Sequence, residues 1–128
     1  MSCPLAATFA AWVRNGAMPA ARLYLRSELV KVESLGTYSC RNVNGAATGK
    51  LSEHASANAV DIAAFVLADG RRLTVKRDWN SADPEIRAFL LAIRTSACRR
   101  FKTVLSPDYN VQHADHFHLD MGRGPFCK

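Results

Sequence analysis

Residues 61–75, Asp-Ile-Ala-Ala-Phe-Val-Leu-Ala-Asp-Gly-Arg-Arg-Leu-Thr-Val, decide how this chain folds. The run from Asp61 to Leu67 is apolar, which is typical of a buried strand. Asp69-Gly70 is a hairpin signal, because this dipeptide is favoured in tight turns between paired strands. Leu73–Val75 then predicts the returning strand.

Helices and further strands are expected on both sides of this hairpin. Ala6–Arg14 predicts an amphipathic helix with Phe9, Trp12 and Val13 on one side, and Asn15-Gly16 is expected to end it. A second short helix is expected from Pro19 to Arg26, followed by a strand over residues 29–37, where apolar and polar residues alternate.

Downstream of the hairpin, Asp83-Pro84 marks a helix start, with Asp at the N-cap and Pro in the first turn. Apolar residues follow at helical spacing as far as Phe101, and Val104-Leu105 begins another extended segment. The alternation over residues 116–121 predicts a strand with two different faces. The order of elements predicts a single α+β domain over residues 1–128, with a small antiparallel sheet packed with helices.

Composition limits the classes of protein that the chain can belong to. With 128 residues, 48% hydrophobic and 22% charged, it has the composition of one ordinary folded domain, which excludes disorder and collagen. No apolar run approaches the ~20 residues of a membrane helix, so no transmembrane segment is expected. The net charge of +6 favours an anionic partner such as nucleic acid, an acidic membrane or a cell-wall polymer.

Four cysteines, Cys3, Cys40, Cys98 and Cys127, are scattered along the chain without a Cys-x-x-Cys pair. An even number in a small chain predicts two disulfides and an oxidising compartment, with the pairing left open. Residues 1–4 lack the basic start and apolar stretch of a signal peptide. We therefore expect a protein of the periplasm or one exported to the cell envelope, with a signal peptide that is not present in this chain.

The histidines fall in two clusters. His54 stands seven residues before Asp61, and the other three lie in the run His113-Ala-Asp-His-Phe-His118. If this run is a strand, His116, His118 and Asp120 share one face, because residues two apart point the same way. Asp115 would then face away from both histidines unless the strand starts after it.

These residue types suit a zinc site on the sheet. Zinc takes imidazole nitrogen and carboxylate oxygen, and a catalytic site keeps three protein ligands and one open position. His54, Asp61 and one histidine of the second cluster supply such a set. Ser52 is expected to support His54, and Asp120 is either a partner of a ligand or a polar strand residue.

The motifs resemble those of known cell-wall peptidases. Residues 52–61, Ser-Glu-His-Ala-Ser-Ala-Asn-Ala-Val-Asp, resemble the Ser-x-His-x-x-Gly-x-Ala-x-Asp motif of zinc D,D-carboxypeptidases, with Ala57 where that motif has Gly. Residues 113–118 resemble the matching motif of penicillin-insensitive murein endopeptidases, and residues 38–42 resemble the segment that carries their substrate-facing arginine. The whole chain resembles the bacterial extensin-like C-terminal domain family.

This resemblance implies a role for each matching residue. It implies that His54, Asp61 and His118 bind Zn²⁺, and that Arg41 holds substrate or steadies developing negative charge. It implies that Asp115 or His116 is the general base and that His113 is a further active-site histidine.

The resemblance implies a zinc-dependent D,D-peptidase that cleaves peptidoglycan stem peptides or cross-links, and we expect it to act as a monomer. The alternative is a zinc-dependent wall-binding module without turnover. A nucleic-acid-binding protein is not expected, because the basic residues are scattered from Arg14 to Lys128 instead of gathered on one face. We expect Trp79 and Tyr109 to pack in or around the core instead of lining a substrate groove. We expect the basic segment over residues 71–77 to form a solvated face of the hairpin.

Overall fold

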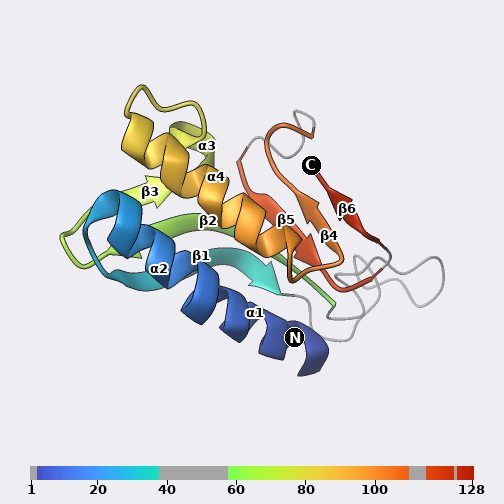
Figure 1. Cartoon of the computed structure of the whole chain (residues 1–128). Coiled ribbons are helices and arrows are strands. Elements are labelled where there is room, and N and C mark those ends of the chain that lie inside the picture. The colour runs from blue at the N-terminus through green and yellow to red at the C-terminus, as the bar shows by residue number, and fades with distance from the viewer. Residues whose placement is uncertain (1–2, 38–57, 110–114, 123) are drawn as a thin grey trace.

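The computed structural model describes residues 3–37, 58–109, 115–122 and 124–128, which form a mixed α+β fold around a sheet of six strands (Figure 1). The helical segments are α1 (Cys3–Trp12), η1 (Val13–Ala17), α2 (Met18–Ala20), η2 (Ala21–Leu25), α3 (Val75–Asp78) and α4 (Pro84–Cys98). The strands are β1 (Leu29–Thr37), β2 (Ala59–Leu67), β3 (Arg72–Thr74), β4 (Thr103–Leu105), β5 (Phe117–Asp120) and β6 (Phe126–Cys127).

The strand order is β1-β2-β5-β4-β6, and β3 pairs with β2. The pairings of β2 with β1, β3 and β5, and of β4 with β5, are antiparallel, as expected. The pairing of β4 with β6 is parallel, so the expectation of a purely antiparallel sheet is wrong at this edge. The difference arises because the chain after β5 turns back and lays β6 alongside β4 in the same direction.

The β2–β3 hairpin is confirmed and begins two residues before the predicted strand. Its turn places Gly70 at φ 96°, a conformation that L side chains rarely adopt, and the Leu67 N–H donates to the Arg71 carbonyl at 2.9 Å. The returning strand ends at Thr74 because the Thr74 side chain accepts a hydrogen bond from the Arg77 N–H at 3.1 Å and caps α3.

The predicted helix end at Asn15-Gly16 is wrong, because the helical backbone continues through η1, α2 and η2 until Arg26 adopts a left-handed conformation. Gly16 instead permits close packing. A Cβ there would lie 2.6 Å from the Ser96 hydroxyl of α4, so only glycine lets the two helical segments approach this closely. None of the helices within the described ranges is long and apolar enough to span a membrane.

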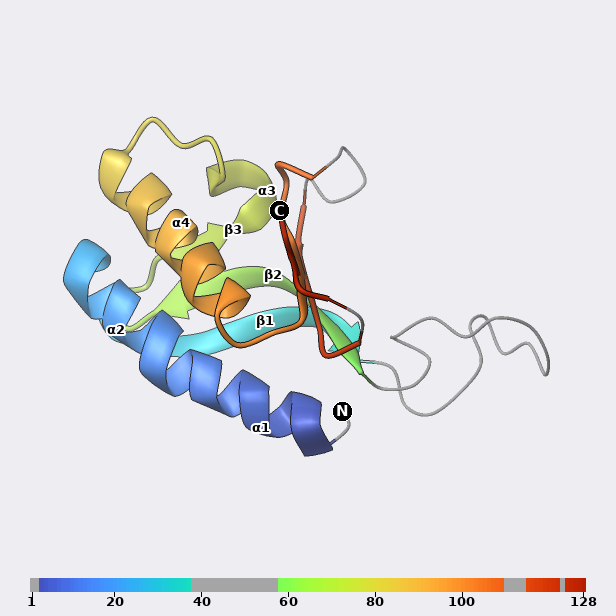
Figure 2. The ribbon, with the colours of Figure 1, turned by 45° about the vertical axis from the view of Figure 1, so that its right-hand side comes forward.

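Figure 2 shows α1, α2 and α4 on the same side of the sheet. Trp12 is fully buried at their centre and donates its indole N–H to Ser96 Oγ at 3.1 Å. Alternation along β5 buries Phe117 and Leu119 in this core and leaves His118 on the opposite face. In β2, Val60 and Ile62 are buried, and beyond a register shift between the Ile62 and Ala64 pairings the Phe65 ring packs against Trp12 and Phe89. The fully buried members of the core include Leu5, Trp12, Val60, Ile62, Phe65, Val75, Phe89, Leu90, Ile93, Val104 and Leu119.

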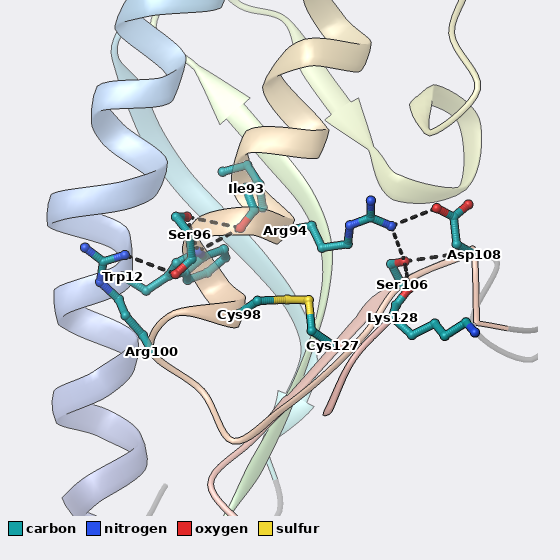
Figure 3. The surroundings of a disulfide bond; sticks show 10 residues. All are labelled: Trp12, Ile93, Arg94, Ser96, Cys98, Arg100, Ser106, Asp108, Cys127 and Lys128. Carbon is teal, nitrogen blue, oxygen red and sulfur yellow. Dashed lines mark hydrogen bonds and ion pairs between the residues drawn. A yellow bond between two sulfur atoms is a disulfide. The ribbon is translucent and has the colours of Figure 1, made fainter. Parts of the chain in front are cut away.

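One of the two expected disulfides is present: Cys98 at the end of α4 is bonded to Cys127 in β6 (Figure 3). Cys3 is an exposed free cysteine, and Cys40 lies outside the described residues. The bond attaches the edge strand β6 to α4, and β6 in turn pairs with β4. It therefore holds the edge of the sheet against the helical layer.

Replacing Cys98 and Cys127 together by serine is expected to lower the free energy of unfolding. The bond closes a 29-residue separation, which corresponds to about 3–4 kcal/mol from loop entropy. Denaturant unfolding with and without reductant measures this difference. A double variant as stable as the oxidised wild type would show that the bond contributes nothing to folding.

Candidate metal and catalytic site

The β2–β5 pairing brings two sequence-predicted ligands together, although they are 57 residues apart in the chain. Asp61 lies directly opposite His118 in the register of the two strands. Their neighbours Ile62 and Leu119 are fully buried in the core, so Asp61 and His118 lie on the other face of the sheet. Asp61 Oδ1 is 3.1 Å from His118 Nδ1.

The second ring nitrogen of His118 is also engaged. His118 Nε2 lies 2.7 Å from Oδ2 of Asp120, the last residue of β5. The imidazole therefore lies between two carboxylates, each close to a different nitrogen, and its side chain is 15% exposed. A pair of carboxylates around a partly buried ring favours positive charge at this point of the sheet.

The pKa of His118 reflects this arrangement. Burial acts to lower the pKa, but the hydrogen bonds and charges of Asp120 and Asp61 outweigh burial and raise the pKa from 6.5 to about 9. In the metal-free chain a proton supplies the positive charge that the carboxylates favour. A metal ion bound to His118 would replace this proton, because histidine binds a metal through a deprotonated ring nitrogen.

In the chelator-treated protein we expect His118 to titrate near pH 9, whereas an unperturbed histidine titrates near pH 6.5. Its contribution to stability is complete below the unfolded pKa of 6.5 and is lost as the pH rises through the folded value of about 9. The free energy of unfolding of the metal-free chain should therefore fall over this interval. Histidine ring NMR measures the titration directly, and a His118 that titrates at or below 6.5 would contradict the carboxylate pairing.

Asp115 and His116 form a second pair beside the first. Strand β5 begins at Phe117, so Asp115 lies in a turn, and its Oδ1 contacts His116 Nδ1 at 2.7 Å. The hydrogen bond from His116 lowers the pKa of Asp115 more than burial raises it. The sequence predicts that Asp115 faces away from the histidines unless the strand starts after it. The strand does start after it, and Asp115 contacts His116.

His116 also faces the ligand pair. Its Nε2 atom lies 3.8 Å from Asp61 Oδ1, while its Nδ1 atom contacts Asp115. The imidazole side chain is 14% exposed, whereas that of Asp115 is 55% exposed. His116 thus lies between Asp61 and an exposed carboxylate, an arrangement in which a histidine can accept a proton while the carboxylate holds its ring.

The remaining predicted site residues, Arg41, His54 and His113, lie outside the described residues, as does Ala57. In the part of the chain that the structure describes, no group of three or more His, Cys, Asp and Glu side chains is arranged to hold a metal ion. Asp61 and His118 supply one carboxylate oxygen and one imidazole nitrogen, which are donors that zinc accepts. The structure therefore describes two of the three predicted ligands, and zinc binding stays a prediction.

The packing expected for Trp79 is confirmed. Trp79 is 8% exposed and its ring meets Phe117 edge to face at 5.5 Å, so it supports β5 from the core side. Tyr109 is 41% exposed and contacts Phe126 in the same geometry at 5.7 Å. Three arginines of the basic segment over residues 71–77 form ion pairs, Arg71–Asp69 and Arg72–Glu33 at the hairpin and Arg77–Asp78 in α3.

Sequence reasoning missed a network that anchors the segment before residues 110–114. Asp108 accepts hydrogen bonds from the Trp79 indole at 3.0 Å and from Arg94 at 2.7 Å. Arg94 also lies over the Trp79 ring. Its Nη1 atom is 3.4 Å from the Ser106 hydroxyl, and Figure 3 draws Arg94 with Ser106 and Asp108. Trp79 precedes α4, Arg94 lies within α4, and Ser106 and Asp108 follow β4. Because these residues are far apart in the sequence, no local spacing indicates the network.

Comparison with known protein families gives a match over the full length of the sequence. The profile of a family described as "Extensin-like protein C-terminus" matches residues 1–128, the whole chain. Neither the curated proteins nor the solved structures include a significant match.

Proposed function

We propose that this chain, which belongs to the extensin-like protein C-terminus family, is a zinc-dependent peptidase that hydrolyses peptidoglycan stem peptides or cross-links. One observation carries the proposal: the Asp61–His118 pair across β2 and β5 lies beside the Asp115–His116 pair. Two donors of the kinds that zinc takes are thus next to a histidine suited to proton transfer.

Zinc would be held by Asp61 and His118, with His54 as the third ligand. When bound, zinc supplies Lewis-acid catalysis, lowering the pKa of water towards neutrality and polarising a carbonyl group. The two described ligands come from paired strands of one sheet, so their separation is fixed by the backbone hydrogen bonds between β2 and β5. A rigid pair of ligands of this kind keeps the reacting groups at a constant distance.

His116 is the general base in this proposal, and Asp115 orients it. The Nδ1 contact with Asp115 turns Nε2 towards Asp61, the side of the site where the peptide bond would be attacked. His116 accepts a proton from the attacking water and returns it to the leaving amine, so hydrolysis yields one carboxylate and one amine. Arg41 would stabilise the negative charge on the carbonyl oxygen, and His113 would assist it.

Peptidoglycan is the proposed substrate because its stem peptides carry free carboxylates and the chain carries a net charge of +6. The Cys98–Cys127 bond suits a protein that works in an oxidising compartment such as the periplasm. A wall-binding module that keeps zinc without turnover is the competing function. The Asp115–His116 pair argues against it, since binding alone needs no base.

Purified cross-linked muropeptide dimers and pentapeptide monomers test the proposal when each is incubated with zinc-loaded protein and analysed by mass spectrometry. Conversion of dimers to monomers identifies an endopeptidase, and loss of one terminal D-Ala from the monomers identifies a carboxypeptidase. Both reactions should stop with chelator. Zinc-dependent retention of the protein on intact sacculi without any product would instead favour the binding module.

A further inference from the structure

Asp120 ends β5 and is held on every side. Its residue exposure is 5%, its Oδ2 contacts His118 Nε2 at 2.7 Å, and its Oδ1 accepts the Gly122 N–H at 3.0 Å. Its backbone carbonyl accepts the Lys102 N–H at 2.9 Å, and its register partners are Ala59 in β2 and Thr103 in β4. The carboxylate is therefore fixed by the sheet and by the turn that follows it.

A fixed carboxylate controls which nitrogen of its histidine partner carries a proton. An ionised carboxylate can only accept hydrogen bonds, so the His118 nitrogen that faces Asp120 must be a donor. When the ring is neutral, it has one N–H and one lone pair. Asp61 is also an acceptor, so the two carboxylates compete for this one N–H. The shorter contact, 2.7 Å to Asp120 against 3.1 Å to Asp61, favours the N–H at Nε2 and leaves the lone pair at Nδ1.

We propose that Asp120 is a positioning residue for the metal centre: it keeps His118 Nε2 protonated, so that the Nδ1 lone pair is directed beside Asp61, where a metal ion binds. This inference rests on the zinc site of the proposed function. Ligating histidines commonly donate their other ring N–H to a carboxylate, which fixes the ring and increases the basicity of the ligating nitrogen. Asp120 meets this requirement with a buried, doubly anchored side chain.

Three substitutions separate positioning of His118 from a general contribution to folding. Asp120→Ala removes the acceptor, and we expect the dissociation constant for zinc to rise by about 10- to 100-fold. Asp120→Asn retains an oxygen that can accept from Nε2 and should recover part of that affinity. Asp78→Asn is the matched control, because Asp78 is also buried, at 7% exposure, but accepts hydrogen bonds from Thr74 and Arg77.

Zinc affinity is measured by competition with a chromophoric chelator on variants whose circular dichroism matches that of the wild type. Histidine ring NMR of the zinc-loaded wild type gives a readout that requires no variant to fold, with the ring proton expected at Nε2 of His118. Wild-type affinity in Asp120→Ala, or a ring proton at Nδ1, would overturn the inference.

The outcomes also separate this inference from the proposed activity. Weakened zinc binding in Asp120→Ala together with a wild type that cleaves no muropeptide would support the role of Asp120 and reject the peptidase. A wild type that binds no zinc would reject both. Cleavage by the wild type with unchanged zinc affinity in Asp120→Ala would keep the peptidase and reject the role of Asp120.

Discussion

Asp61→Asn is expected to abolish zinc binding and to reduce muropeptide hydrolysis by about a thousandfold or more, since metal catalysis is worth several kcal/mol and each 1.4 kcal/mol is tenfold in rate. The amide keeps the size of the side chain but removes the negative charge beside His118 Nδ1. It would therefore be a poor replacement for the anionic ligand that we propose at this position. Zinc content of the dialysed variant and initial rates on cross-linked dimers measure the two effects together.

Asp69→Asn is the control for Asp61→Asn. Asp69 is a carboxylate of the same hairpin region, but it pairs with Arg71 on the surface. We expect this variant to bind one zinc ion and to hydrolyse dimers at the wild-type rate. An Asp61→Asn variant that loses zinc yet retains hydrolysis would show that the reaction does not use this site.

The second large effect is expected at His116. His116→Gln should lower kcat by about 10²- to 10⁴-fold, the usual contribution of a general base, while zinc affinity stays close to that of the wild type. Asp115→Asn should have a smaller effect, because the amide still holds the His116 ring through a hydrogen bond but no longer as an anion. Rates on dimers and chelator competition are compared for both variants.

The relative size of these two effects identifies the base. If Asp115 were the base, Asp115→Asn would lose more activity than His116→Gln. If neither variant lost activity while both still bound the wall, the binding module would be the better account. His116 contacts Asp115 at 2.7 Å and directs its other nitrogen to within 3.8 Å of Asp61, which favours the larger loss at His116.

Turn and capping residues could be predicted from the sequence because their effect is confined to neighbouring residues. The Asp69-Gly70 turn and the Asp83 cap both act within a few residues, and the Asp83 side chain indeed accepts a hydrogen bond from the Glu85 N–H at the start of α4. Gly16 was misread because its reason is tertiary: it makes room for Ser96 of α4, which no window around residue 16 contains. Strand β6 was missed for a different reason: its two residues alone give no periodicity.

For the site, alternation along residues 116–121 correctly separated the core side chains Phe117 and Leu119 from His118. The sequence could not show that Asp61 faces His118, because that depends on the register between β2 and β5. The sequence also left two interpretations of Asp120 open, a partner of a ligand or a polar strand residue. The structure shows its contact with His118. The roles of Arg41, His54 and His113 remain predictions, since these residues lie outside the described ranges.

The most direct test is a zinc titration of chelator-treated protein, with zinc occupancy and hydrolysis of cross-linked peptidoglycan followed in the same sample. We predict that activity is absent without metal, rises in proportion to occupancy and saturates at one zinc ion per chain. Full hydrolysis in the presence of chelator, or a folded chain that binds one zinc ion and leaves every muropeptide unchanged, would contradict the account.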